Sequence, residues 1–152
     1  MDWVIEVICV IGVLILITLP IIYYNQLPDI IPTHYDSQGK ADGHGAKSSI
    51  WMLPILGTLM YLLMLKLNQY PHIFNYQQKI TEQNAEKQYT IATRMLRIVN
   101  VSVVRVFTYL TYSTIWIAMG KHSHLSALFT PLVCVSVFVL VGFSIYISTK
   151  KE

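Results

Sequence analysis

The chain has 152 residues, of which 54% are hydrophobic and 12% are charged, and its net charge is +3. A typical soluble domain carries about 25% charged residues, so this composition argues against a water-soluble fold. The small positive charge gives no indication of a nucleic-acid partner. We therefore expect the lipid bilayer to surround much of the chain.

Four long apolar stretches explain the excess of hydrophobic residues, and they cover residues 3–24, 50–67, 98–119 and 125–148. Each is about 18 to 24 residues long, and a bilayer core of about 30 Å requires about 20 helical residues. The first stretch is a poor signal peptide, because Asp2 and Glu6 stand where basic residues are expected. We predict an all-α, polytopic membrane protein whose four transmembrane helices form a single domain over residues 1–152.

Lysine and arginine are divided unevenly between the two ends of these predicted helices. The N-terminus, the loop 68–97 and the C-terminus would share one side of the membrane, and this side carries seven basic residues: Lys66, Lys79, Lys87, Arg94, Arg97, Lys150 and Lys151. The other side carries three: Lys40, Lys47 and Lys121. Because cytoplasmic segments retain the excess of lysine and arginine, we predict cytoplasmic termini, with loop 25–49 outside and loop 68–97 inside.

The second half of the inner loop has a helical pattern. Thr81 is followed by Glu82, which is typical of an N-cap with an acid in the first turn, and no proline or glycine occurs from there to residue 97. Apolar Ile91, Met95 and Ile98 recur at helical spacing. The pattern predicts a cytoplasmic helical extension that leads directly into the third transmembrane helix.

Two charged residues lie inside predicted membrane segments, Glu6 in the first and Arg105 in the third. A charge at the centre of a membrane helix costs at least about 2.5–3.5 kcal/mol, so Arg105 requires compensation. One prediction is an intramembrane ion pair between Glu6 and Arg105. The alternative is that the Arg105 side chain extends to the interface without a protein partner. Arg105 shares a helical face with three aromatic residues, Tyr109, Tyr112 and Trp116. We expect this face to point into the bundle, and the alternative is that it lines a ligand cavity.

The loop 25–49 is more strongly patterned than a simple tether. Pro28 and Pro32 fix the backbone and favour extended structure in the residues that precede them. Gly39 and two later glycines permit tight turns before Ser48 or Ser49 caps the second helix. We predict an irregular, non-helical loop outside the membrane.

This loop contains the order Leu-Pro-x-x-Ile-Pro-x-His, followed by Gly, Asp and Lys. These positions are Leu27, Pro28, Ile31, Pro32, His34, Gly39, Asp42 and Lys47. The pattern resembles the domain-of-unknown-function 1648 (DUF1648) family of bacterial membrane proteins, over roughly a third of the chain. Members of that family include the Sdp immunity protein, which protects cells from a secreted toxin and signals to a repressor. The resemblance implies a protein of the bacterial cytoplasmic (inner) membrane with a role of the toxin-immunity or peptide-sensing type.

The loop residues allow a structural, a ligand-binding or a metal-binding interpretation. Seven of them are expected either to hold the loop structure or to bind a ligand: Pro28, Asp29, Pro32, His34, Gly39, Asp42 and Lys47. Four are candidates for a divalent metal site, because imidazole and carboxylate groups are metal ligands: His34, Asp36, Asp42 and His44. The sequence contains none of the usual catalytic motifs, and we assign no catalytic residue and no cofactor other than this metal.

Three functions are consistent with these observations. The first is a binding or interaction module that presents the loop to a protein or peptide partner outside the membrane. The second is a metal-dependent membrane enzyme that uses the histidine and aspartate side chains of the loop. The third is a small oligomeric transporter, since four helices alone form only a narrow pore. The oligomeric state is left open by the sequence.

Overall fold

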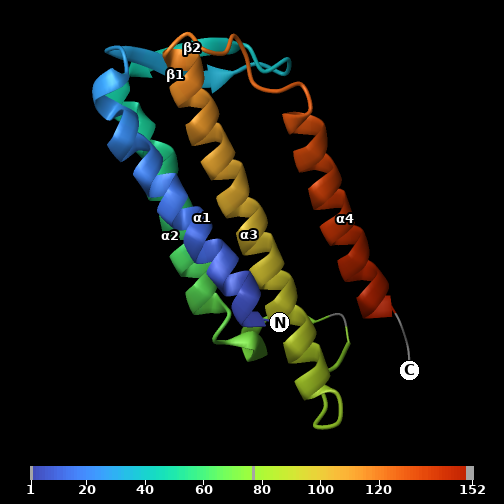
Figure 1. Ribbon diagram of the computed structural model, residues 1–152. Coiled ribbons are helices and arrows are strands. Elements are labelled where there is room, and N and C mark those ends of the chain that lie inside the picture. Colours follow the sequence, from blue (N-terminus) through green and yellow to red (C-terminus); the bar gives the residue numbers. More distant parts are fainter. Residues whose placement is uncertain (1, 77, 150–152) are drawn as a thin grey trace.

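The computed structural model describes residues 2–76 and 78–149, and these form four long helices with a two-stranded sheet at one end (Figure 1). The helices are α1 (Asp2–Tyr23), α2 (Met52–Leu67), α3 (Ala85–Ala118) and α4 (Phe129–Thr149). The strands are β1 (Ile30–Tyr35) and β2 (Ala41–Ala46), and the short 3-10 helices are η1 (Tyr24–Gln26), η2 (Lys47–Trp51) and η3 (Pro71–Ile73). Each of the four apolar stretches contains a helix, as predicted, while the sheet is an addition to the expected all-α fold.

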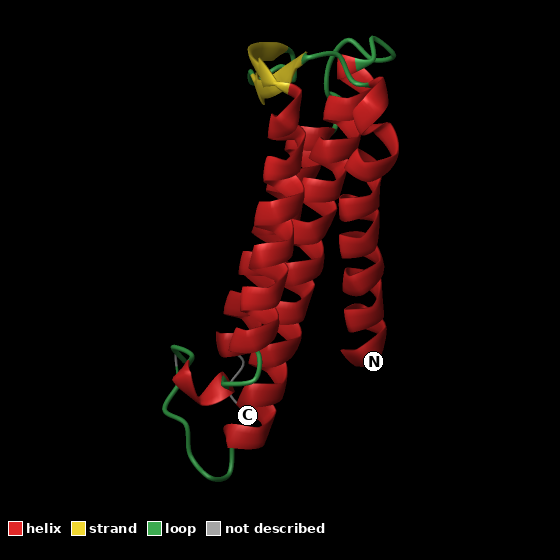
Figure 2. Cartoon of the chain, turned by 90° about the vertical axis from the view of Figure 1, so that its left-hand side faces the viewer, coloured by secondary structure: helices red, strands yellow, loops and turns green. Residues whose placement is uncertain are grey.

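Three segments are long and apolar enough to cross a membrane, namely Trp3–Gln26, Lys47–Leu67 and Ala85–Ala118. The described apolar part of α4, Phe129–Val139, is shorter than a bilayer requires. The helix α1 begins, and α4 ends, at the end of the bundle opposite the sheet (Figures 1 and 2). We call the two ends of the bundle the sheet end and the opposite end.

Helices α1, α2 and α3 pack closely, and two glycines allow their approach. A Cβ added to Gly12 would lie 2.7 Å from Val104 Cγ1, and one added to Gly57 would lie 2.7 Å from Leu16 Cδ2. Small residues let membrane helices pack closely, which matters because lipid provides no hydrophobic driving force for their association. Buried residues form one cluster in the bundle, Cys9, Val13, Tyr61 and Val104, and another beneath the sheet, Leu27, Ile31, Ile50 and Ile115.

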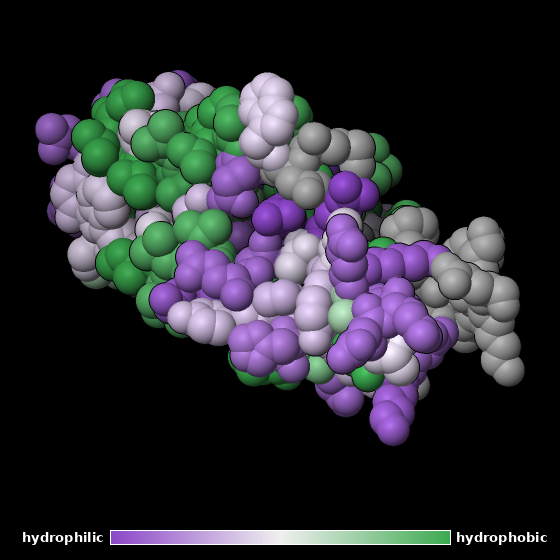
Figure 3. Space-filling model, turned by 90° about the horizontal axis from the view of Figure 1, so that it is seen from below, coloured by the Kyte–Doolittle hydropathy of each residue, from purple (hydrophilic) through white to green (hydrophobic). Residues whose placement is uncertain are grey.

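Helix α3 extends well beyond the other helices at the opposite end, which confirms the predicted helical extension into the third span. It begins at Ala85 and not near Thr81, because the Thr81 N–H donates to Asn84 Oδ1 at 2.8 Å and forms a turn there. The segment before it folds back on α3, with the rings of Tyr76 and Tyr89 5.7 Å apart. Seen from this end, hydrophilic side chains gather on the surface beside hydrophobic flanks (Figure 3).

Helix α4 contacts the rest of the bundle mainly at the sheet end (Figure 1). The ring of Phe129 stacks on that of Tyr109 with centroids 4.5 Å apart, and the Ser126 N–H donates to the Tyr109 hydroxyl at 2.9 Å. Farther along α4, Leu132 and Phe138 are 64% and 74% exposed. The described part of α4 therefore stands beside α3 and does not close over it.

The predicted ion pair between Glu6 and Arg105 is wrong for the described residues. Glu6 instead accepts a hydrogen bond from the Tyr61 hydroxyl at 2.6 Å, and Arg105 is exposed. The heights of the two residues explain this, because the contact of Val104 with Gly12 places Arg105 level with the middle of α1. The predicted orientation of the face that carries Arg105 holds only at its upper end. Trp116 packs against Tyr23 of α1 and the cluster beneath the sheet, whereas Tyr109 stacks against α4 and Arg105 is exposed.

Candidate functional site

The sheet is an antiparallel hairpin made by the motif loop. Ile30 pairs with Ala46, Pro32 with His44 and Tyr35 with Ala41, and the register shifts on both sides of His34. Proline lacks an amide donor and is tolerated in strands chiefly at edges and bulges, which fits Pro32 beside such a shift. The predicted extended backbone is confirmed, but the loop is an ordered hairpin and not irregular.

The apolar motif positions anchor the hairpin to the helices. Leu27 and Ile31 are buried against Ile50 and Ile115, so they attach the first strand to the start of α2 and to the end of α3. Pro32 is buried as well, while Pro28 is exposed. Packing therefore explains the motif positions Leu27, Ile31 and Pro32, but not Pro28.

The turn of the hairpin is held by Asp36 and Gly39. The Asp36 carboxylate accepts hydrogen bonds from the Gln38 and Lys40 amides at 2.8 and 2.9 Å. Gly39 has a φ of +79°, a conformation in which a side chain is strained. Its carbonyl oxygen accepts the N–H of Leu125 at 2.8 Å, so the loop after α3 is attached to the turn.

His34 and Asp42 meet on the solvent side of the hairpin. His34 Nδ1 lies 2.5 Å from Asp42 Oδ1, and their side chains are 72% and 46% exposed. A Cβ at Gly43 would approach the His34 Cβ to 2.9 Å, so the glycine makes room for the histidine. Two of the predicted site residues thus form one exposed polar pair on a rigid support.

Asp29 and Lys47 form a second pair at the base of the hairpin. Lys47 Nζ lies 3.7 Å from Asp29 Oδ1 and 5.2 Å from the centre of the Tyr24 ring. The Lys47 amide also donates to the Asp29 carbonyl oxygen at 2.9 Å. The backbone hydrogen bond closes the base of the hairpin, and the Lys47 ammonium group lies over the Tyr24 ring in a cation–π contact.

The metal-site prediction is not supported by the described residues, in which no three His, Cys, Asp or Glu side chains lie close enough to hold an ion. Asp36 is engaged by the turn amides, and His44 is an exposed residue on β2. His34 and Asp42 alone come together, and two ligands do not complete a metal site.

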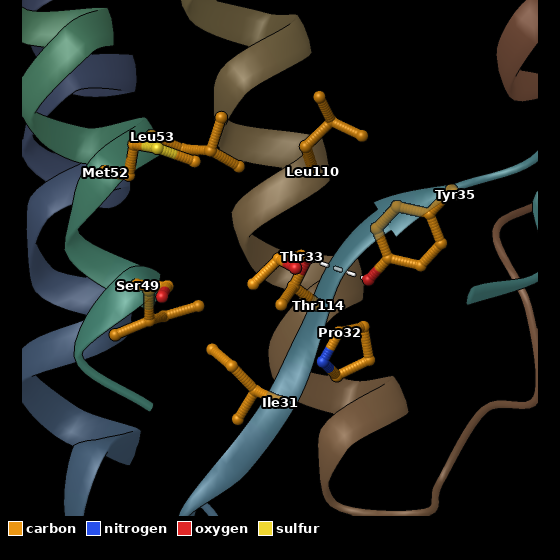
Figure 4. Close-up of a pocket in the computed structure, with 10 residues that line it drawn as sticks. Ile31, Pro32, Thr33, Tyr35, Ser49, Met52, Leu53, Leu110 and Thr114 are labelled. Carbon is orange, nitrogen blue, oxygen red and sulfur yellow. Dashed lines mark hydrogen bonds between the residues drawn. The ribbon is translucent and has the colours of Figure 1, made fainter. Parts of the chain in front are cut away.

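A cavity of about 110 Å³ lies between β1, η2 and the helices (Figure 4). Its lining includes Ile31, Pro32, Thr33, Tyr35, Met52 and Leu110. At its edge the Tyr35 hydroxyl lies 2.9 Å from Thr114 Oγ1, and burial raises the pKa of Tyr35. The sequence gives no sign of this cavity or of the Tyr35–Thr114 bond, because no local pattern connects residues separated by 79 positions.

Comparisons with known proteins agree with the resemblance seen in the motif. The model of a family described as "Domain of unknown function (DUF1648)" matches residues 10–58, which cover most of α1, the hairpin and the start of α2. An uncharacterized protein of Archaeoglobus fulgidus is 31% identical over an alignment of 64 residues, and the match covers 37% of this chain. The match spans 35% of that relative's length. No solved structure matches the chain.

Proposed function

We propose that the protein is a four-span membrane protein that uses the hairpin to bind a protein or peptide partner outside the bacterial cytoplasmic membrane. In this topology, residues 1–152 are one domain, α4 is the fourth span, and both termini are cytoplasmic. The excess of lysine and arginine in the opposite-end segments supports this orientation. The start of α1 and the end of α4 at that same end also support an even number of spans.

One observation carries the binding function, namely the exposed His34–Asp42 pair on a buried support. The side chains of His34 and Asp42 are solvent-accessible, while Ile31 in the same strand is 1% exposed. Surface ion pairs add little stability, so an ordered pair on a rigid hairpin is better suited to recognition than to holding the fold. A partner with a charged or hydrogen-bonding group fits this surface.

The cavity beside the hairpin adds an apolar element to the same site. Met52, which lines the cavity, has 51% of its surface accessible. An apolar side chain of the partner fits a space of this size, and apolar pockets flanked by a few polar groups are typical of binding sites. We therefore favour a peptide segment with one polar and one apolar anchor.

Peptide binding can be tested without knowledge of the natural partner. A displayed library of random peptides would be selected against the full chain in nanodiscs, with empty nanodiscs as the counter-selection. We expect enriched peptides to lose at least about tenfold in affinity for His34→Ala and Asp42→Asn, as is usual for central interface positions. His122→Ala is the matched control, because it removes another exposed histidine from the loop after α3. If no peptide is enriched, or if all three variants bind equally, the binding function is wrong.

The orientation has its own test. Cysteines would replace Lys40 and Lys87 in a background without Cys9 and Cys134, and intact cells would be treated with a membrane-impermeant maleimide. Position 40 should react in intact cells, and position 87 only after permeabilisation. The reverse pattern would refute cytoplasmic termini.

A further inference from the structure

Arg105 lies near the middle of the membrane segment of α3. Its neighbour Val104 contacts Gly12, which is the eleventh of the 22 residues of α1, and Thr108 Oγ1 donates to the Gly12 carbonyl oxygen at 3.4 Å. The middle of α1 is therefore level with this part of α3. Arg97 lies two turns closer to the opposite end, about 12 Å along the axis at 1.5 Å per residue. This distance exceeds the length of an arginine side chain, so Arg105 does not reach the interface fully.

The Arg105 charge is also uncompensated within the described residues. Its side chain is exposed, and among the side chains that the structure describes none forms a hydrogen bond or ion pair with it. Glu6 of α1 accepts a hydrogen bond from Tyr61 lower in the bundle. A charged group in lipid is unfavourable without a partner, so a partner of opposite charge is expected.

The side of α3 that carries Arg105 is open to such a partner. Tyr109, one turn above Arg105, stacks on Phe129 at the start of α4, and this contact defines the direction of the face. Below it, Arg105 itself is exposed, so the described part of α4 does not cover its side chain. No residue of α4 from Phe129 to Thr149 is acidic, so closure of α4 over this face would not neutralise the arginine.

We propose that this face of α3 docks a transmembrane helix of a different protein that carries a carboxylate near its middle. Charge complementarity selects this occupant, because an Asp or Glu at the same depth would form a hydrogen-bonded pair with Arg105 in a medium of low dielectric constant. A second copy of the chain fits less well, because the Glu6 carboxylate lies lower and is already bonded by Tyr61. The inference is independent of the hairpin function, since it concerns another surface.

The test uses the full chain in nanodiscs and a defined probe. The probe is a synthetic helix of about 20 leucine and alanine residues with one central glutamate, and its partner peptide carries glutamine instead. Association would be followed by energy transfer between labelled peptide and protein. We expect the glutamate peptide to bind at least about tenfold more tightly than the glutamine peptide.

The variants decide whether Arg105 is responsible. Arg105→Gln should abolish the preference for glutamate, while Arg105→Lys should retain much of it. Lys121→Gln is the control, because it removes a positive charge outside the membrane segment. Arg105→Lys keeps the test valid should Arg105→Gln fail to fold. Equal binding of both peptides by the natural chain, or a preference that survives in Arg105→Gln, overturns the proposal. So does self-association that is lost in both Arg105→Gln and Glu6→Gln, since the occupant is then a second copy.

Discussion

The backbone N–H of Leu125 donates to the carbonyl oxygen of Gly39 at 2.8 Å and joins the loop after α3 to the turn of the hairpin. Leu125 is buried, and a Cβ on Gly39 would lie 2.9 Å from the Leu125 Cβ. The hairpin and the loop that leads to α4 therefore form one cap over the bundle. This contact and the Tyr109–Phe129 stack fix the start of α4.

Replacement of Gly39 by alanine should weaken the contact between the hairpin turn and Leu125. The positive φ alone costs about 1–2 kcal/mol for a residue with a side chain, and the clash with Leu125 adds to that cost. We expect a lower free energy of unfolding in detergent–SDS mixtures for Gly39→Ala. Gly120→Ala is the matched control, because Gly120 has a φ of +71° but no atom within 4 Å of its Cβ position. Equal losses in the two variants would show that the Leu125 contact contributes nothing.

Removal of the Tyr35 hydroxyl should weaken the attachment of the hairpin to α3. Tyr35→Phe removes the bond to Thr114 and keeps the ring beside the cavity. A hydrogen bond of this kind contributes about 0.5–1.5 kcal/mol, so the loss in unfolding free energy should lie in that range. A double-mutant cycle with Thr114→Val isolates the pair. Additive losses in that cycle would argue against a coupled bond.

The same tyrosine predicts a change of stability at alkaline pH. Burial raises the pKa of Tyr35 in the folded chain, while the bond to Thr114 lowers it by a smaller amount. The unfolded chain then releases this proton first, so stability is complete below a pH of about 10 and falls as pH rises toward the folded pKa. Unfolding measured between these limits should show a smaller decline for Tyr35→Phe than for the natural chain. Identical pH profiles would contradict the prediction.

The helices were predictable from the sequence, and the hairpin was not. The length of an apolar run determines whether it crosses a bilayer, so residues 3–24 and 98–119 gave helices directly. Strand β2 consists of Ala41–Ala46 and contains no β-branched or aromatic residue, and β1 contains Pro32. Local preference therefore opposes β2, whereas in β1 it opposes a strand only at Pro32. Their conformation depends on the burial of Ile31 against Ile115, which is a contact between distant segments.

The position of one helix along the bundle axis relative to another was also not predictable from the sequence. Distance from the predicted cytoplasmic end of each apolar stretch suggests that Glu6 and Arg105 can meet, but periodicity does not give the relative position of their helices. The close contact of Gly12 with Val104 sets that position. Since it depends on which small residues meet across the bundle, only the three-dimensional packing reveals it. The sequence places His34 and Asp42 in one loop, whereas their pairing depends on the shifted register of the hairpin.

Loss of the Tyr61 hydroxyl should weaken the association of α1 with α2 near Glu6. Hydrogen bonds between membrane helices contribute about 0.6 kcal/mol on average and about 1.7 kcal/mol at most, so Tyr61→Phe should reduce the unfolding free energy within that range. Tyr112→Phe is the control, because Tyr112 contacts Trp116 and His122 through its ring. If both substitutions have the same effect, the bond to Glu6 is not a stabilising contact.

Asp36 distinguishes a structural role from a metal-binding role within the hairpin. An asparagine oxygen can accept the two amide bonds that the carboxylate accepts now, so Asp36→Asn should retain most of the stability. Asp36→Ala removes both bonds, and we expect a loss of about 1–3 kcal/mol at about 0.5–1.5 kcal/mol per bond. A metal ligand would behave differently, because asparagine lacks the charge that a divalent ion requires. Unfolding of the three proteins with and without EDTA therefore decides between the roles. If Asp36→Asn and Asp36→Ala lower the unfolding free energy equally, and EDTA destabilises the natural chain, Asp36 is a metal ligand. If the unfolding free energy falls from Asp through Asn to Ala and EDTA has no effect, Asp36 only holds the turn.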